Sequence, residues 1–317
     1  MTCFFPIDAW RAPGKRQPVF QSAGALKNSH HLLPCGQCNS CRLRKARDWA
    51  SRCENELVMH EKACFITLTY NDENLPLNGS LEPRDMDLFW KNLRWHISTE
   101  KMYCMTKQEV KLHGRPQPAI RYFYAGEYGE RTFRPHYHAI LFGYDLPDKQ
   151  FITDERGYPE YSSEFLDEVW SKGNCRIGSA TFDSACYVAR YIMKKQLGKD
   201  AEAYYKEKGW IPPYSRQSRR PGLGKAFFDK YKDDMYNYDM YIGSKKMKVK
   251  PPKYYDKLLE QEDPERFAKI KKKRIQAVAK QEATMDALAT LHHRYRRLVD
   301  RSEHLEYTMN KKRDFDQ

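Results

Sequence analysis

Two stretches of alternating residues, AIRYFYAGEYG at 119–129 and HYHAILFG at 136–143, constrain the fold of this chain most strongly. Each is typical of a β-strand, and the short connection between them predicts an antiparallel hairpin. Successive side chains of a strand point to opposite faces, so His136 and His138 share one face. If Glu127 pairs with His136, its carboxylate joins both imidazoles, because directly opposed residues lie on the same face.

This Glu-His-His cluster has the composition of an open divalent-cation site. Three mixed nitrogen and oxygen ligands leave coordination positions for a phosphate oxygen and water, and they suit Mn²⁺ or Mg²⁺ as well as Zn²⁺. Glu130, farther round the connection, is the alternative carboxylate. Two histidines in an ordinary half-buried strand would give the same local pattern, so neighbouring motifs must decide between the two interpretations.

Further strands and helices surround the hairpin in the sequence. The expected elements are a buried strand at 64–70 (CFITLTY), a helix over about 82–98, a helix within 162–173, a short strand within 174–182 and a helix within 184–198 that Ser184 caps. Helices mixed with strands in this way predict an α+β fold with a central antiparallel sheet and flanking helices.

Shifts in composition divide the chain into four expected segments. These are an N-terminal Cys-rich segment and helix at 1–60, a core at 61–198, a basic Pro/Gly-rich segment at 199–253 and a charged helical tail at 254–317. We expect residues 1–34 to be irregular and residues 199 to about 250 to form loops with short elements that pack beside the core. DNA holding, self-association and helicase recruitment are all compatible with the tail.

The balance of charge points to a polyanionic partner. The chain has 56 Lys and Arg against 42 Asp and Glu, a formal net charge of +14, and 14% of its residues are aromatic. Basic residues beside aromatic rings suit single-stranded nucleic acid, because bases stack on rings while cations hold phosphates. An anionic membrane surface would also attract a basic chain, but no apolar run approaches the roughly 18 residues of a spanning helix.

The N-terminus lacks the charged and then apolar pattern of a signal peptide, so we expect a cytoplasmic protein. For a phage-encoded chain this would be the cytoplasm of the bacterial host. Cysteines in a reducing compartment are thiols or metal ligands.

Cys35, Cys38 and Cys41 follow a C-x2-C-x2-C pattern, and Cys3 is the candidate for a fourth ligand. Four thiolates would hold a tetrahedral structural Zn²⁺ and tie the N-terminus to the following helix. The alternative fourth ligands are His30, His31 and Cys53. A [4Fe–4S] cluster uses the same local spacing, and reduced thiols without metal are the third interpretation. Arg42 and Arg44 follow the cysteines and are candidates for contact with the DNA backbone.

The helix expected at 184–198 carries Tyr187 and Tyr191 one turn apart, so they share a face that Lys194 continues. A tyrosine hydroxyl can attack a phosphodiester and retain it as a phosphotyrosine. With a pKa of about 10 it is rarely ionised at pH 7, a handicap of roughly 4 kcal/mol that a nearby cation must offset. Lys194, Lys195 and the metal ion are the candidates. An amphipathic helix with two aromatics facing the core is the alternative interpretation.

Taken together, FITLTY, HYH and YVARYIMKK resemble, in order and spacing, the three motifs of the HUH endonucleases that initiate rolling-circle replication, in the subclass with two active-site tyrosines. The resemblance covers Cys64 to Lys195. With the cysteine-rich N-terminus, it is closest to the replication initiators of gokushovirus-type microviruses, which are small single-stranded DNA phages. It implies a ferredoxin-like or RRM-like HUH fold for the core.

The resemblance implies that His136 and His138 bind the catalytic Mg²⁺ or Mn²⁺ and that Tyr187 and Tyr191 are the nucleophiles. It does not settle the third ligand, for which Glu127 is our candidate. Thr67 and Thr69 lie on the first-motif strand, which in this family supports the site and contacts DNA. Arg134, Arg219 and Arg220 are further expected DNA contacts.

The implied function is to nick the origin on single-stranded DNA, to form a 5′ phosphotyrosine, and later to religate the displaced strand into a circle. A host polymerase, and a host helicase, would be the partners in this reaction. An HUH relaxase or transposase is the alternative within the same class. From a different class, a non-catalytic, zinc-stabilised DNA-binding protein would need only the charge and the cysteines.

Overall fold

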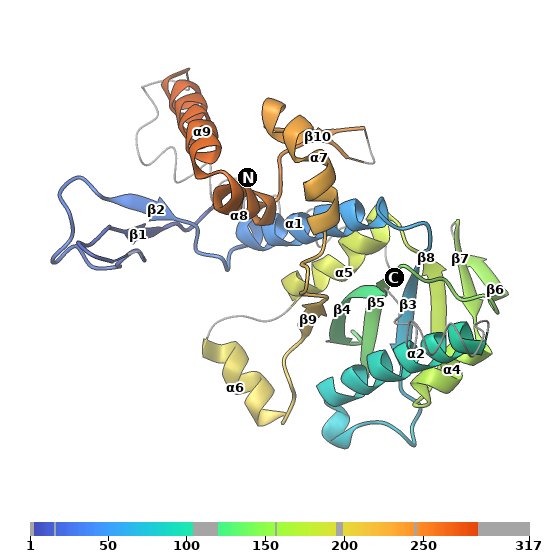
Figure 1. The fold of residues 1–317 in the computed structure, drawn as a ribbon. Helices are drawn as coiled ribbons and strands as arrows, with labels where there is room; N and C mark the ends of the chain where they lie inside the picture. The colour runs from blue at the N-terminus through green and yellow to red at the C-terminus, as the bar shows by residue number, and fades with distance from the viewer. Residues whose placement is uncertain are drawn as a thin grey trace. The chain divides into compact units, whose positions relative to one another are not determined.

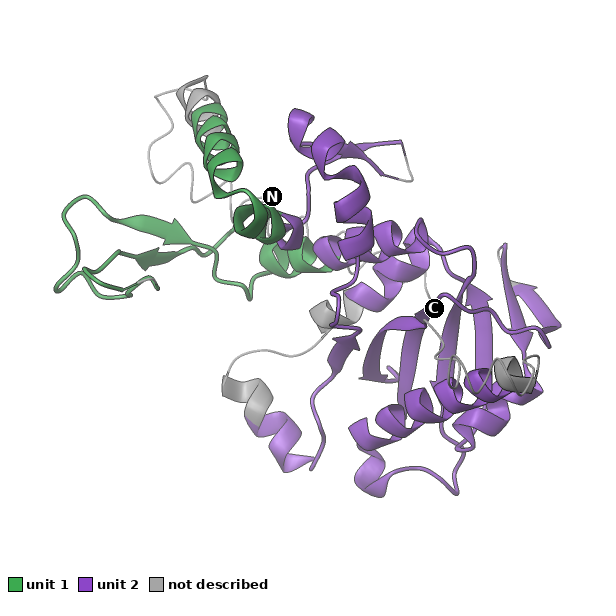
Figure 2. Cartoon of the chain, viewed as in Figure 1, with its two compact units in different colours: residues 1–46, 256–317 green, residues 47–255 purple. Residues whose placement is uncertain are grey.

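A seven-stranded antiparallel sheet organises the larger part of the protein (Figure 1). The computed structural model describes residues 3–15, 17–103, 120–155, 157–194, 199–243 and 246–284. The chain divides into two compact units, unit 1 with residues 1–46 and 256–317 and unit 2 with residues 47–255 (Figure 2).

Unit 2 contains the sheet, in the strand order β6-β7-β8-β3-β5-β4-β9. Its strands are β3 (Ala63–Thr69), β4 (Arg121–Tyr128), β5 (Pro135–Phe142), β6 (Gln150–Glu155), β7 (Tyr158–Ser162), β8 (Cys175–Ser179) and β9 (Tyr214–Gln217). Its helices are α2 (Pro83–Tyr103), α4 (Glu164–Trp170), α5 (Phe182–Lys194), α6 (Lys199–Glu207), α7 (Lys225–Tyr238), the short 3-10 helix η1 (Leu77–Gly79) and the later part of α1 (Asn39–Leu57). The expected α+β class with an antiparallel sheet is confirmed.

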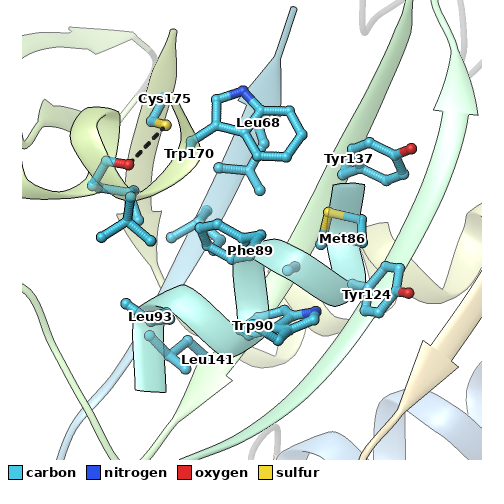
Figure 3. Packing of buried hydrophobic residues seen from close by; sticks show 14 of the residues in the cluster. Leu68, Met86, Phe89, Trp90, Leu93, Tyr124, Tyr137, Leu141, Trp170 and Cys175 are labelled. Carbon is cyan, nitrogen blue, oxygen red and sulfur yellow. Dashed lines mark hydrogen bonds between the residues drawn. The ribbon is translucent and has the colours of Figure 1, made fainter. Parts of the chain in front are cut away.

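One face of the sheet carries the main apolar core, under α2 and α4 (Figure 3). Leu68 of β3 and Tyr137 of β5 pack there with Phe89 and Trp90 of α2 and with Trp170 of α4, and all five side chains are buried. Every second residue of the central strands faces this core, as the period of a β-strand requires. Because this face takes the apolar residues, the opposite face is left for polar ones.

Strands β4 and β5 pair in the register expected of the hairpin. Glu127 lies opposite His136, which confirms the pairing proposed from the sequence. Strand β3 flanks β5 on its other side, with Thr69 opposite His136 and Thr67 opposite His138. Opposed residues share a face, so three adjacent strands present polar side chains together on the side away from the main core.

Helix α5 lies on this polar side of the sheet. Its first turn is closed by reciprocal bonds, in which the Ser184 amide donates to Thr181 Oγ1 at 3.2 Å and the Thr181 amide donates to Ser184 Oγ at 2.7 Å. This is a capping box with Thr181 as the N-cap and Ser184 in the third helical position. The expected cap at Ser184 is therefore wrong, because the sequence offers two hydroxyls three residues apart.

The segment 199–250 contains more regular structure than the loops expected there. Strand β9 pairs with β4 and extends the sheet at its edge. Helix α7 has 14 residues and buries Phe228, Met235 and Tyr236. Two further short strands, β10 (Tyr241–Ile242) and β11 (Lys248–Val249), pair with each other. The expectation failed because the many Gly, Pro and basic residues around α7 obscured the spacing of its apolar residues.

Unit 1 contains β1 (Ile7–Ala9), β2 (His31–Leu33), the start of α1, most of α8 (Lys253–Glu262), and α9 (Pro264–Thr284). Strands β1 and β2 form an antiparallel pair, so residues 1–34 are not irregular throughout. Arg274 of α9 binds both carboxylate oxygens of Asp256 in α8, at 2.7 and 3.0 Å. The helical pattern expected from about Tyr254 is confirmed as far as Thr284. Within the described ranges, no helix combines the length and apolarity that crossing a membrane requires.

Gly173, between α4 and β8, lies against the end of β3. A Cβ atom at this position would overlap the carbonyl oxygen of Thr69 and lie 2.5 Å from the amide nitrogen of Asn71. We predict that Gly173→Ala destabilises the protein by about 3 kcal/mol or more in urea unfolding, because backbone must move to relieve the clash. Gly178→Ala is the matched control, since its Cβ would meet only a ring carbon of Phe65 at 3.5 Å. Equal losses from the two variants would contradict this packing.

Candidate functional site

Glu127, His136 and His138 form a compact cluster on the polar side of the sheet. One ligand atom from each lies within 4.8 Å of the others. Glu127 comes from β4 and both histidines from β5, and their pairing register brings the three side chains together. Glu127 and His138 are buried, and His136 is partly buried.

Hydrogen bonds orient both imidazole rings. A carbonyl oxygen only accepts, so the Nδ1 atom of His136, 3.1 Å from the carbonyl oxygen of Arg134, carries a proton. The Nε2 atom of His136 lies 2.8 Å from Oε1 of Glu127. On His138, Nδ1 lies 3.0 Å from Thr67 Oγ1 and Nε2 lies 3.3 Å from the same Glu127 oxygen. Both Nε2 atoms therefore converge on one carboxylate oxygen.

Glu127 is ionised in this environment. Burial by itself raises the pKa of its carboxyl group, but hydrogen bonds and charge interactions with His136 and His138 outweigh burial and lower the pKa to about 2. An Nδ1-protonated imidazole facing a carboxylate needs a positive charge between them, which a second proton or a metal ion supplies. Two nitrogens and one oxygen, held by bonds behind the rings, are a donor set that fits a divalent cation.

Tyr187 of α5 stands beside this cluster. Its ring centroid is 5.1 Å from that of His138, with the ring planes at 80°, and 6.1 Å from that of Phe65. The side chain is 36% exposed, so a ligand can reach it from solvent. Tyr191 follows one turn later and Lys194 ends the helix, but only their backbone is described. Lys195 lies outside the described residues.

Two residues expected to contact DNA are bound within the protein. The guanidinium of Arg134 donates to a carboxylate oxygen of Asp72 at 2.6 Å and to the carbonyl oxygen of Tyr70 at 3.0 Å. The hydroxyl of Thr69 donates to the carbonyl oxygen of Asn174 at 2.8 Å. These bonds hold the end of β3 and the turn before β5 in place around the cluster.

The remaining basic candidates lie in two places. Arg219 and Arg220 are exposed in the loop that follows β9. Arg42 and Arg44 lie near the start of α1, where Arg44 Nη2 is 3.6 Å from the sulfur of Cys41. The structure does not bring these four residues to the Glu-His-His cluster by any described contact.

Arg176 of β8 is a cation that the sequence pattern did not single out. It lies opposite Thr67, which in turn lies opposite His138, so all three belong to the same face of the sheet. Its side chain is 48% exposed and its guanidinium lies 3.9 Å from Glu160. Strand alternation predicts that Arg176 faces away from its apolar neighbours, but only the strand order reveals that this face is the one with the histidines.

Cys3, Cys35, Cys38 and Cys41 form a second cluster, in unit 1, with their sulfurs all within 4.8 Å of one another. The sulfur of Cys3 lies 3.5 Å from that of Cys35 and 3.8 Å from that of Cys38. Zinc bonded to four thiolates at about 2.3 Å with tetrahedral angles separates the sulfurs by about 3.8 Å. The four thiols are free, so their spacing fits a structural zinc ion.

Backbone groups around the cysteines favour thiolates. The Cys35 amide donates to the sulfur of Cys3 and the Cys38 amide to the sulfur of Cys35, each at 3.3 Å. Burial raises the pKa of Cys38, but hydrogen bonds from the backbone of Phe4 and Cys41 outweigh burial and lower the pKa to about 7. The cluster groups Cys3 with the three motif cysteines, whereas His30, His31 and Cys53 are not part of it.

We predict about one zinc ion per chain in freshly purified protein. Cys38→Ser should lower the zinc content and the melting temperature, because three thiolates hold zinc less tightly than four. Cys186→Ala is the control, since Cys186 lies on α5 outside the cluster. Metal analysis by mass spectrometry measures the zinc content. Iron in place of zinc would instead indicate an iron–sulfur cluster, and neither metal in the wild type would contradict both interpretations.

Comparison with known proteins agrees with this arrangement. Residues 63–196, from β3 through α5, match the family model of the replication-associated protein ORF2. The chain is 34% identical over 282 residues to replication-associated protein VP4 of Bdellovibrio phage phiMH2K, covering 86% of this chain and 83% of the relative. It is 33% identical over 246 residues to replication-associated protein ORF2 of Spiroplasma virus 4, covering 74% and 70%. No solved structure gives a significant match. The chain therefore belongs to the family of phage replication-associated proteins.

Proposed function

We propose that this replication initiator nicks single-stranded DNA at the phage origin through a phosphotyrosine and later rejoins the displaced strand into a circle. The observation that carries the proposal is the position of Tyr187, whose ring lies 5.1 Å from the ring of His138 in the Glu-His-His cluster. A nucleophile on a helix beside a cation-binding cluster on a sheet is what cleavage of a phosphodiester needs. The central position of β3 and β5 supports assignment of the sheet to the ferredoxin-like or RRM-like HUH architecture.

Glu127, His136 and His138 would hold Mg²⁺ or Mn²⁺. When bound, such an ion neutralises the charge that develops on the phosphate in the transition state. The carbonyl oxygen of Arg134 and the hydroxyl of Thr67 hold the two imidazoles in the orientation that this role requires. Thr67 is thus a positioning residue for His138.

In the nicking step, the hydroxyl oxygen of Tyr187 or Tyr191 attacks the phosphorus. A bond forms between the tyrosine oxygen and phosphorus, the bond from phosphorus to the 3′ oxygen breaks, and the phenolic proton ends on the released 3′ hydroxyl. Lys194 and Lys195 are proposed to favour the phenolate by their charge. Arg176 adds a guanidinium on the same face of the sheet, where it can hold a non-bridging phosphate oxygen.

Rejoining reverses this exchange at the second origin copy. A host polymerase extends the free 3′ hydroxyl while a host helicase separates the strands. The second tyrosine then cuts the regenerated origin, and the released 3′ hydroxyl attacks the first phosphotyrosine, which restores the phosphodiester and the tyrosine hydroxyl. The phosphotyrosine conserves the energy of the ester, so closure needs no nucleoside triphosphate.

Basic residues outside the cluster are proposed to hold the DNA backbone. The candidates are Arg42, Arg44, Arg134, Arg219 and Arg220. With a formal net charge of +14, DNA binding should weaken steeply as the salt concentration rises.

We predict that wild-type protein with Mn²⁺ becomes covalently joined to 3′-labelled single-stranded oligonucleotides, and that the Tyr187→Phe, Tyr191→Phe double variant does not. The phenyl ring keeps the packing against Phe65 but has no oxygen to attack phosphorus. The assay follows label that moves with the protein on a denaturing gel. A full-strength adduct in the double variant would contradict the nucleophile assignment. Strong binding without any adduct in the wild type would favour the non-catalytic DNA-binding protein.

We further predict that Thr67→Val lowers the affinity for Mn²⁺ by about 10- to 100-fold, because His138 loses the partner of its Nδ1 atom. Thr69→Val is the matched control on the same strand, since its hydroxyl bonds to the carbonyl oxygen of Asn174. The paramagnetic resonance signal of free Mn²⁺ measures the affinity. Equal affinities in the two variants would show that Thr67 does not position the histidine.

A further inference from the structure

A cluster of four aromatic rings and one lysine lies beyond the end of the β4–β5 hairpin that carries the histidines. Its members are Tyr128, Phe133, Tyr204, Lys208 and Trp210, which we call the aromatic platform. Trp210 stacks on Tyr128 with centroids 4.3 Å apart and planes at 14°, and Phe133 lies 6.2 Å from Trp210. The ammonium of Lys208 lies over three of the rings, 4.6 Å from Trp210, 4.8 Å from Tyr204 and 5.2 Å from Phe133.

The platform is built firmly into unit 2. Helix α6 ends in a Schellman motif, in which the amide of Trp210 donates to the carbonyl of Tyr205 at 2.8 Å and the amide of Gly209 to that of Lys206 at 3.1 Å. The indole nitrogen of Trp210 then donates to the carbonyl oxygen of Asn78 at 2.7 Å. These bonds fix the Trp210 indole before any ligand arrives.

The same platform is bonded to the hairpin. The hydroxyl of Tyr128 donates to the carbonyl oxygen of Ile211 at 2.7 Å and accepts from the amide of Leu81 at 3.1 Å. Because Tyr128 directly follows Glu127 on β4, the platform is anchored to the strand that supplies the carboxylate of the cluster.

Phe133 is the unusual member of the platform. Its side chain is 49% exposed, although burial of a phenyl ring is favourable. Its backbone has φ of 54°, a left-handed conformation that is rare and strained for a bulky residue. Strain of this kind persists where the surrounding structure imposes it, and it is concentrated at functional sites. A strained backbone that presents an aromatic ring to solvent suggests that the ring has a ligand.

We infer that the aromatic platform binds a base of single-stranded DNA next to the strand position that is cut, with the base stacked on Phe133 and its phosphate held by Lys208. Phe133 is three residues from His136, so their Cα atoms are at most about 11 Å apart. A strand of a few nucleotides spans this distance. Unpaired bases expose the flat faces that stack on rings, whereas paired bases in a duplex do not. The inference deepens the proposed function and rests on it, since it takes the bound strand to be the substrate.

Binding without added divalent ion tests the platform separately from nicking. We measure the affinity of the full chain for a labelled single-stranded oligonucleotide and for the duplex of the same sequence. Phe133→Ala should bind the single strand about tenfold more weakly and the duplex unchanged. Phe133→Leu should lose as much, because leucine is apolar but has no ring. Phe151→Ala is the control, since Phe151 is 62% exposed on β6 at the opposite edge of the sheet.

Two further variants separate binding from a merely structural role. Phe133→Gly should bind the single strand as weakly as Phe133→Ala but melt at a higher temperature than Phe133→Ala, because glycine adopts the left-handed backbone without strain. Lys208→Gln should reduce the slope of log affinity against log salt concentration by about 0.7, the value for one lost phosphate contact to a single strand.

Unchanged single-strand binding in Phe133→Ala, or an equal loss in Phe151→Ala, would overturn the inference. Adduct formation by the same proteins with Mn²⁺ is a separate readout. Adducts in the wild type with no binding loss in Phe133→Ala would reject the platform and leave nicking intact. A binding loss in Phe133→Ala with no adduct in the wild type would retain the platform as a single-strand site and reject the nicking function.

Discussion

The pairing of Glu127 with His136 across β4 and β5 is the constraint on which the rest of the site depends. A slip of one residue in this pair would turn both histidines toward the apolar core and expose Tyr137 on the polar side. The core prevents such a slip, because Tyr137 and Tyr124 are fully buried beneath α2 and their exposure would be costly. Apolar packing on one face of the sheet therefore fixes the polar geometry on the other.

The polar face gathers parts that are far apart in the sequence. Strand β3 brings Thr67 to His138, β8 brings Arg176 to the same row of residues, and α5 brings Tyr187 over the histidines. The turn of the hairpin extends this arrangement to Phe133 at the end of the sheet. In our proposal, phosphate chemistry and base stacking lie along one short path, so a single strand can be held by a base while its backbone is cut.

Much of this site was predictable because its signals are local. The alternation of β4 and β5 predicted that Glu127, His136 and His138 share a face, and the spacing of Tyr187 and Tyr191 predicted one helix face. Other features depend on tertiary structure. Residues 214–217 are too short to indicate a strand, and β9 forms only because the edge of β4 offers it hydrogen bonds. The stacking of Trp210 on Tyr128 joins residues 82 positions apart, which no local pattern predicts.

The measurement that tests the central claim most directly is to digest the protein after reaction with single-stranded DNA and Mn²⁺ and to identify the peptide that carries the nucleotide by mass spectrometry. The proposed mechanism predicts a 5′ phosphonucleotide on Tyr187 or Tyr191, within α5. A nucleotide joined to any other side chain, or DNA cut without a covalent adduct, would contradict it.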